Sequence, residues 1–178
     1  MLLTFFRLFA GPIVFFLSVF QQAYVFSLLI FTLASISDYL DGLLARKYNH
    51  ETSIGAILDP IADKILALFA LFSVTIITND PFVGLMSSLI LGREFFISGL
   101  REYASQTYQA NLLKVTLLAK TKTAVQFIAL FSYFLGFLLN DSLIIFLSNF
   151  ILLLATFMTF KTGLEYTLNI FFGAKDLK

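Results

Sequence analysis

The chain has 178 residues, of which 59% are hydrophobic and 13% charged, with a formal net charge of +1. A soluble domain of this length could not bury so much apolar surface, so we expect a polytopic membrane protein. The sequence has no basic stripe that would bind nucleic acid, so no nucleic-acid partner is expected. The lack of cysteine excludes disulfides, zinc–thiolate sites and thiol nucleophiles, and a single histidine, His50, cannot build a multi-histidine metal site.

Six membrane-spanning helices are expected along the chain, because a span needs about 20 apolar residues. The predicted spans are Leu3–Phe20, Tyr24–Ala45, Ile57–Ile77, Phe82–Leu100, Val115–Leu139 and Leu143–Phe160. A last amphipathic piece, Leu164–Phe172, is expected to lie at the membrane interface. We therefore predict one all-α integral membrane domain over residues 1–178, without internal repeats.

The positions of Lys and Arg predict how these helices are oriented. The short turns QQAY, TNDP and ND contain no Lys or Arg, whereas the other connections hold nearly all of the cations. Cytoplasmic loops are the ones enriched in Lys and Arg. Both termini and the cationic loops near 46–56 and 101–122 are therefore expected on the cytoplasmic side of the inner membrane.

Four aspartates stand out between residues 37 and 64. Asp38 and Asp41 are three residues apart, and Asp59 and Asp63 are four apart, so each pair shares one face of its helix. Because the connection between these helices is short, the four carboxylates are expected to line one recess just under the cytoplasmic surface. Carboxylates within a membrane are costly and are functional candidates. Oxygen-only clusters suit Mg²⁺ or Mn²⁺, and paired metals are known in phosphoryl chemistry.

Small residues lie close to both aspartate pairs. Gly42 and Ala45 follow the first pair, and Gly55 precedes the second. Such residues either let helices pack closely or leave room for a flat ligand. For the aspartates themselves, the structural alternative is that they cap helices and pair with nearby Arg and Lys side chains.

The residues from Asp38 to Asp63 form the pattern D-x-x-D-G-x-x-A-R-x(8)-G-x-x-x-D-x-x-x-D. This resembles the signature of the CDP-alcohol phosphatidyltransferases. The segment LTFFRLFAGP (3–12) is similar to the opening of the first helix in this family. The segments GREFFISGLRE (92–102) and AKTKTAVQ (119–126) are similar to the branch that makes phosphatidylglycerophosphate. The resemblance implies a membrane enzyme that moves a phosphatidyl group from a CDP-linked lipid to an alcohol and releases CMP.

The resemblance also implies roles for the motif residues. Asp38, Asp41 and Asp59 would bind two divalent metal ions, Mg²⁺ or Mn²⁺. Asp63 would be the general base, with metal binding as a further role that the sequence leaves open. The residues expected to bind CDP-diacylglycerol are Gly42, Ala45 and Gly55, which would line the nucleotide pocket, and Arg46, which would contact the nucleotide part.

Glycerol 3-phosphate is the acceptor that the last two segments favour. This small, doubly anionic alcohol needs cations near the metals, and Arg suits bidentate phosphate contact. The candidate residues are Arg93, Arg101 and Lys120, then Arg7 and Thr4 by family analogy, with Lys122 left open. Arg93 has an alternative partner in Glu94 or Glu102, and the others could be ordinary membrane anchors.

Two alternative functions stay open at this point. One is a sister enzyme with another alcohol, such as serine, an inositol phosphate or phosphatidylglycerol. The other is a divalent-cation transporter, although transport sites usually lie near the bilayer midplane, often between repeated halves. The aspartates instead lie toward one face, which favours the transferase. By resemblance, the enzyme is expected to be a homodimer in the lipid bilayer.

Overall fold

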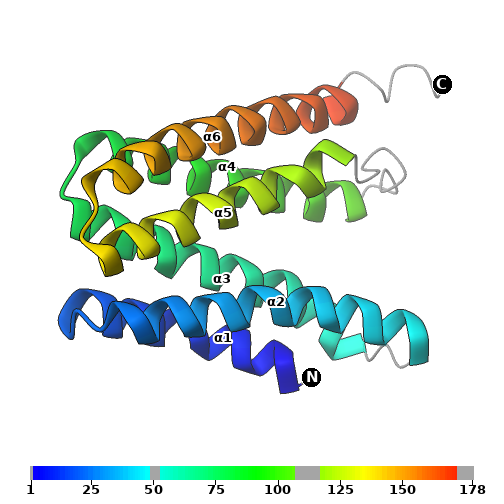
Figure 1. Cartoon of the computed structure of the whole chain (residues 1–178). Helices are drawn as coiled ribbons and strands as arrows, with labels where there is room; N and C mark the ends of the chain where they lie inside the picture. The colour runs from blue at the N-terminus through cyan, green and yellow to red at the C-terminus, as the bar shows by residue number, and fades with distance from the viewer. Residues whose placement is uncertain (1, 49–52, 107–116, 172–178) are drawn as a thin grey trace.

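A computed structural model describes residues 2–48, 53–106 and 117–171, all of which lie in helices or the turns that join them (Figure 1). Within these ranges, the side chains of 2–3, 38–48, 53–57, 105 and 117–120 lie outside the described part. The helices are α1 (Leu2–Phe15), continued by the π-helical turn η1 (Phe16–Phe20), α2 (Tyr24–Tyr48), α3 (Ser53–Thr78), α4 (Pro81–Gln106), α5 (Leu117–Leu139) and α6 (Ser142–Phe171).

Most of the described helices have the length and composition of membrane spans. In the described part of the chain, four are long and apolar enough to cross a membrane, namely Leu58–Thr78, Pro81–Ala104, Thr121–Leu139 and Ser142–Phe171. Two further apolar helical stretches, Thr4–Phe20 and Tyr24–Ser37, are shorter. The length and composition of these helices confirm the prediction of an all-α, multi-pass membrane protein. The count of six spans stays a prediction.

One expectation about the C-terminal region is wrong. We expected Leu164–Phe172 to form a separate amphipathic piece, but α6 continues without a break from Ser142 to Phe171. Lys161 and Gly163 look like a helix end in the sequence. In the structure, however, Thr162, Gly163 and Tyr166 are buried, so the packing of α6 continues past them. This packing is the reason that the helix does not end near residue 160.

Three tight turns reverse the chain at one end of the bundle. Each contains one residue with a positive φ, namely Gln22 (51°), Asn79 (48°) and Asn140 (52°). After the second and third, an aspartate caps the next helix. The Asp80 carboxylate accepts a hydrogen bond from the backbone N–H of Phe82 at 2.9 Å, and Asp141 accepts one from Leu143 at 2.8 Å. The predicted turns at TNDP and ND are thus confirmed.

The opposite end of the bundle brings the motif-bearing segments together (Figure 1). There α1 and α3 begin, α2, α4 and α6 end, and α5 begins. The α1–α3 pair is especially close, because a Cβ atom on Gly11 would lie 3.0 Å from the Ile65 carbonyl oxygen and 3.2 Å from the Leu66 Cα. A residue without a side chain is what lets these two backbones meet.

Candidate active site

Asp59 and Asp63 both contact α1 from the first turns of α3. The Thr4 hydroxyl donates a hydrogen bond to Oδ1 of Asp59 at 2.7 Å. The Arg7 guanidinium donates from Nη2 to the same oxygen at 2.9 Å, and from Nη1 to Oδ1 of Asp63. One arginine therefore forms ion pairs with two of the four predicted metal ligands.

The two sides of this cluster differ in burial. The Arg7 side chain is 0% exposed, whereas the side chains of Asp59 and Asp63 are 41% and 36% exposed. A buried guanidinium needs such partners, because a buried charge without them is costly. The carboxylates remain reachable from outside the bundle, as a site for a cation or a polar substrate requires.

For the α2 side of the predicted recess, the structure describes only the backbone. Asp38 and Asp41 lie on α2, but their side chains are outside the described part, as are those of the predicted nucleotide-binding residues. Among the side chains that the structure describes, no three acidic or metal-ligating groups come together. The four-carboxylate recess and the positions of Gly42, Ala45, Arg46 and Gly55 around it therefore stay predictions.

A second charged cluster joins α4, α5 and α6. Glu94 Oε1 lies 3.2 Å from Nη1 of Arg93 and also accepts a hydrogen bond from Nζ of Lys122. Nη2 of Arg93 donates to the Thr162 hydroxyl at 2.8 Å. Arg93 and Lys122 are buried, at 7% and 8% exposure. Two buried cations thus share one carboxylate, so the cluster keeps an excess of positive charge.

The two clusters are linked through α3. Lys64 follows Asp63 directly, and its ammonium group donates a hydrogen bond to the hydroxyl of Ser98 on α4. Ser98 lies one turn after Glu94 and in turn donates to the Glu94 carbonyl oxygen at 2.7 Å. The carboxylates on α3 and the cations on α4 and α5 therefore belong to the same end of the bundle.

The remaining acceptor-site candidates are less enclosed. Arg101 is exposed, and its guanidinium carbon lies 5.4 Å from the centroid of the Tyr166 ring, a cation–π distance. Lys120 lies on α5, but its side chain is outside the described part. For Arg93, the alternative partner expected from the sequence, Glu94, is observed.

Two residue roles were not predicted from the sequence. Arg7 was expected to contact phosphate, and its pairing with Asp59 and Asp63 was not foreseen. The sequence indicates Glu94 only as a neighbour of Arg93, and its contact with Lys122 is found only in the structure. Both lie within predicted membrane spans, where an ionisable residue itself indicates a partner or a function.

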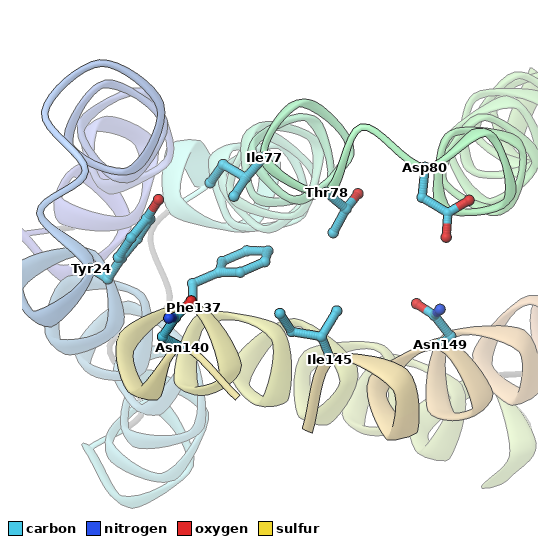
Figure 2. Close-up of a pocket in the computed structure, with 8 residues that line it drawn as sticks. All are labelled: Tyr24, Ile77, Thr78, Asp80, Phe137, Asn140, Ile145 and Asn149. Atoms are coloured by element: carbon cyan, nitrogen blue, oxygen red, sulfur yellow. The ribbon is translucent and has the colours of Figure 1, made fainter. Parts of the chain in front are cut away.

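A cavity of about 340 Å³ lies at the other end of the bundle, near the turns (Figure 2). In Figure 2 the Asp80 carboxylate and the Asn149 amide point into the same gap from opposite sides. The cavity is lined by Tyr24, Ile77, Thr78, Asp80, Phe137, Asn140, Ile145 and Asn149. Its lining contains no Lys or Arg, so it offers no positive charge for a phosphate. It also lies far along the bundle from the α3 aspartates.

Comparison with known proteins yields a family and several relatives. The model of the CDP-alcohol phosphatidyltransferase family matches residues 1–161. The CDP-diacylglycerol–glycerol-3-phosphate 3-phosphatidyltransferase of Wigglesworthia glossinidia brevipalpis is 42% identical over 133 residues, or 73% of this chain and 72% of the relative. The protein of the same name from Cereibacter sphaeroides is 47% identical over 112 residues, or 62% of this chain and 50% of the relative. The one from Salmonella choleraesuis is 40% identical over 132 residues, or 72% of each chain.

Proposed function

The chain belongs to the CDP-alcohol phosphatidyltransferase family, and on this premise we propose that it transfers the phosphatidyl group of CDP-diacylglycerol to glycerol 3-phosphate. The products are phosphatidylglycerophosphate and CMP. The family that the motif from Asp38 to Asp63 resembles is thereby confirmed. The observation that carries the choice of acceptor is the name shared by relatives that are 40–47% identical to this chain.

The donor set of the motif fits divalent metal ions, on which this family generally depends. Asp38, Asp41, Asp59 and Asp63 supply only carboxylate oxygens, as Mg²⁺ and Mn²⁺ prefer. Oδ2 of Asp59 accepts no hydrogen bond from any side chain that the structure describes, and the carboxylate is 41% exposed. When bound, two metal ions would neutralise the pyrophosphate and align the phosphorus for in-line attack.

Asp63 is the residue that we assign to proton transfer. In the reaction, the hydroxyl of glycerol 3-phosphate attacks the phosphorus that bears the diacylglycerol group, and the bond from that phosphorus to the CMP oxygen breaks. The attacking hydroxyl must lose its proton, and the partly exposed Asp63 carboxylate can accept it. Arg7 holds this carboxylate from the buried side, so Asp63 is fixed toward the open side of the site.

The CDP-lipid is assigned to the α2 side of the site. Gly42 and Ala45 on α2 and Gly55 on α3 would line the nucleotide pocket, and Arg46 would contact the nucleotide part. The support for this assignment is the motif itself and the helical backbone that carries it. Gly42, Ala45 and Arg46 lie within about one turn of one another on α2.

The acceptor phosphate is assigned to cations of α4 and α5. Arg93 and Lys122 share one carboxylate, and this excess of positive charge favours an anionic acceptor over an uncharged one. Arg101 and Lys120 are further candidates at the same end of the bundle. Arg7 and Thr4 also stay predicted phosphate ligands, although their observed contacts support another role.

The membrane arrangement that we propose has six spans, with both termini and the active site on the cytoplasmic side of the inner membrane. It is supported by the position of the cations and by the helix ends that gather at one end of the bundle. We further propose a homodimer, on family resemblance.

An activity assay on purified protein in detergent tests the function directly. The assay supplies CDP-diacylglycerol, Mg²⁺ or Mn²⁺ and one alcohol at a time, and follows CMP release. Release with glycerol 3-phosphate only, abolished by EDTA, is the expected result. Release with serine, an inositol phosphate or phosphatidylglycerol instead would keep the reaction class and refute the acceptor. No release from folded protein would refute the transferase and favour cation transport.

A further inference from the structure

Thr4 and Arg7 hold the α3 aspartates from the buried side of α1. Both donate to Oδ1 of Asp59, at 2.7 Å and 2.9 Å, and Arg7 also donates to Oδ1 of Asp63. Thr4 is 3% exposed and Arg7 0% exposed. The packing of α1 against α3 therefore fixes the positions of these donors. The side chains of Asp59 and Asp63 remain partly exposed on the side away from α1.

The contacts at Asp59 are concentrated on one of its two oxygens. Oδ1 receives both donors, whereas Oδ2 receives no hydrogen bond from any side chain that the structure describes. A carboxylate held in this way cannot rotate freely, so its other oxygen points in one direction. Groups that orient metal ligands by hydrogen bonding raise metal affinity, and their loss typically costs about 10–100-fold.

We propose that Thr4 and Arg7 are positioning residues that orient Asp59 and Asp63 for binding a divalent metal ion. The inference rests on the proposed function only in assuming that the bound metal ion serves phosphatidyl transfer. Arg suits this position because its planar guanidinium has separate N–H groups for two carboxylates, which a Lys ammonium cannot match in geometry. A guanidinium that is fully buried against two carboxylates also has little surface left for an acceptor phosphate.

Manganese binding to the purified protein in detergent tests this role without any substrate. The concentration of free Mn²⁺ is followed by electron paramagnetic resonance during titration. We expect Thr4→Val to weaken binding roughly 3- to 10-fold and Arg7→Lys about 10- to 100-fold. Thr4→Ser keeps the hydroxyl and should bind within about twofold of the unsubstituted protein.

A matched control is available on α6. Thr156 is buried to a similar extent, at 5% exposure, but its hydroxyl donates to the Leu152 carbonyl within its own helix. Thr156→Val should therefore leave Mn²⁺ affinity unchanged. Arg7→Lys keeps the positive charge and changes only the hydrogen-bond geometry, so unchanged or tighter Mn²⁺ binding in folded Arg7→Lys would overturn the proposal. Unchanged affinity in Thr4→Val would do the same.

Two further outcomes separate this inference from the proposed function. If Thr4→Val binds Mn²⁺ normally but needs more glycerol 3-phosphate, the residue is a phosphate ligand and the inference is wrong. If the unsubstituted protein binds Mn²⁺ and its variants behave as expected, yet no alcohol gives CMP, the transferase is refuted and the positioning role holds. Absence of Mn²⁺ binding to the unsubstituted protein overturns the inference. Should Arg7→Lys not fold, the Thr4 variants alone decide.

Discussion

At the scale of single residues, Asp63 combines a predicted chemical role with an observed structural one. It is the assigned acceptor of the hydroxyl proton, and it is also a partner of the buried Arg7. Asparagine keeps the size of the side chain and one carbonyl oxygen that Arg7 can contact, but it does not accept the proton. The substitution therefore separates the two roles more cleanly than alanine would.

We expect Asp63→Asn to lower kcat by about 10²–10⁴-fold, the usual contribution of a general base. CMP release at saturating Mn²⁺ and substrates measures this loss. Binding of CDP-diacylglycerol should change little, because the nucleotide contacts are assigned to other residues, namely Gly42, Ala45, Arg46 and Gly55. Asp141→Asn, at a helix cap in the α5–α6 turn, is the control for removing a carboxylate elsewhere. Near-normal turnover of Asp63→Asn would show that the proton goes to another group.

Glu94 gives a second prediction at the same scale. In Glu94→Gln, the buried cations Arg93 and Lys122 lose their shared negative partner and no longer keep their common orientation. Hydrogen bonds to charged groups are worth about 1.5–3 kcal/mol, so the apparent KM for glycerol 3-phosphate should rise roughly 10-fold or more. The KM for CDP-diacylglycerol should stay within about twofold. Initial-rate kinetics with each substrate varied in turn measures the two KM values separately.

Glu102→Gln is the matched control, since Glu102 is exposed and its carboxylate accepts a hydrogen bond from Gln106, one turn later. The assignment fails if Glu94→Gln raises the KM for the CDP-lipid instead. It also fails if glycerol 3-phosphate binds more tightly, because Glu94 would then compete with the phosphate for the cations.

The sequence predicts the aspartates better than their partners, and the reason is distance along the chain. Each aspartate pair is recognisable because residues three or four apart share a helix face. Arg7 and Asp63 are 56 residues apart, and Arg93 and Thr162 are 69 apart. Such pairs depend on how helices pack, which a local pattern does not contain. The presence of a charge in an apolar helix could be read from the sequence, but its partner could not.

At the scale of the helices, the close approach of α1 and α3 positions the aspartate cluster. Gly11 lies one turn after Arg7, and its missing side chain admits the α3 backbone near Ile65. Any side chain at this position must push the helices apart by a few tenths of an ångström. Because Thr4 and Arg7 reach Asp59 and Asp63 across the same contact, such a shift should loosen the site as well as the fold.

We therefore expect Gly11→Ala to lower the thermal unfolding midpoint in detergent and to weaken Mn²⁺ binding. Gly99→Ala is the comparison, since a Cβ on Gly99 would meet no atom within 4 Å. By helix propensity alone, each change should stabilise the protein by up to about 1 kcal/mol. Equal stabilisation by both variants would show that the α1–α3 contact can relax, and that Gly11 does not set the geometry of the site.

Helix boundaries were predictable where the local chemistry is distinctive. The Asn-Asp pairs at 79–80 and 140–141 combine a residue that tolerates positive φ with a capping aspartate. In the C-terminal part of α6 the local signal is misleading, because Lys161 and Gly163 resemble a helix end although the helix continues to Phe171. Its continuation depends on the burial of Thr162 and Tyr166 against neighbouring helices, which is a property of the packed bundle and not of the segment.

At the scale of the whole molecule, the arrangement of the helices makes the orientation in the membrane testable. Gln21 lies at the turn end of the bundle, and Gln106 ends α4 at the opposite end, where the charged clusters lie. Both residues are exposed. The chain has no cysteine, so a single introduced cysteine reports on one position without background.

Because Lys and Arg favour the cytoplasmic side, Gln21→Cys should react with a membrane-impermeant maleimide in intact bacterial spheroplasts. Gln106→Cys should react only after the membrane is permeabilised, and both should react fully in detergent. The reverse pattern would place the charged clusters on the outer face, where glycerol 3-phosphate from the cytoplasm and CDP-diacylglycerol in the inner leaflet could not reach them. Labelling of both positions from outside would contradict the bundle as a membrane-spanning unit, since its two ends would then share one face of the bilayer.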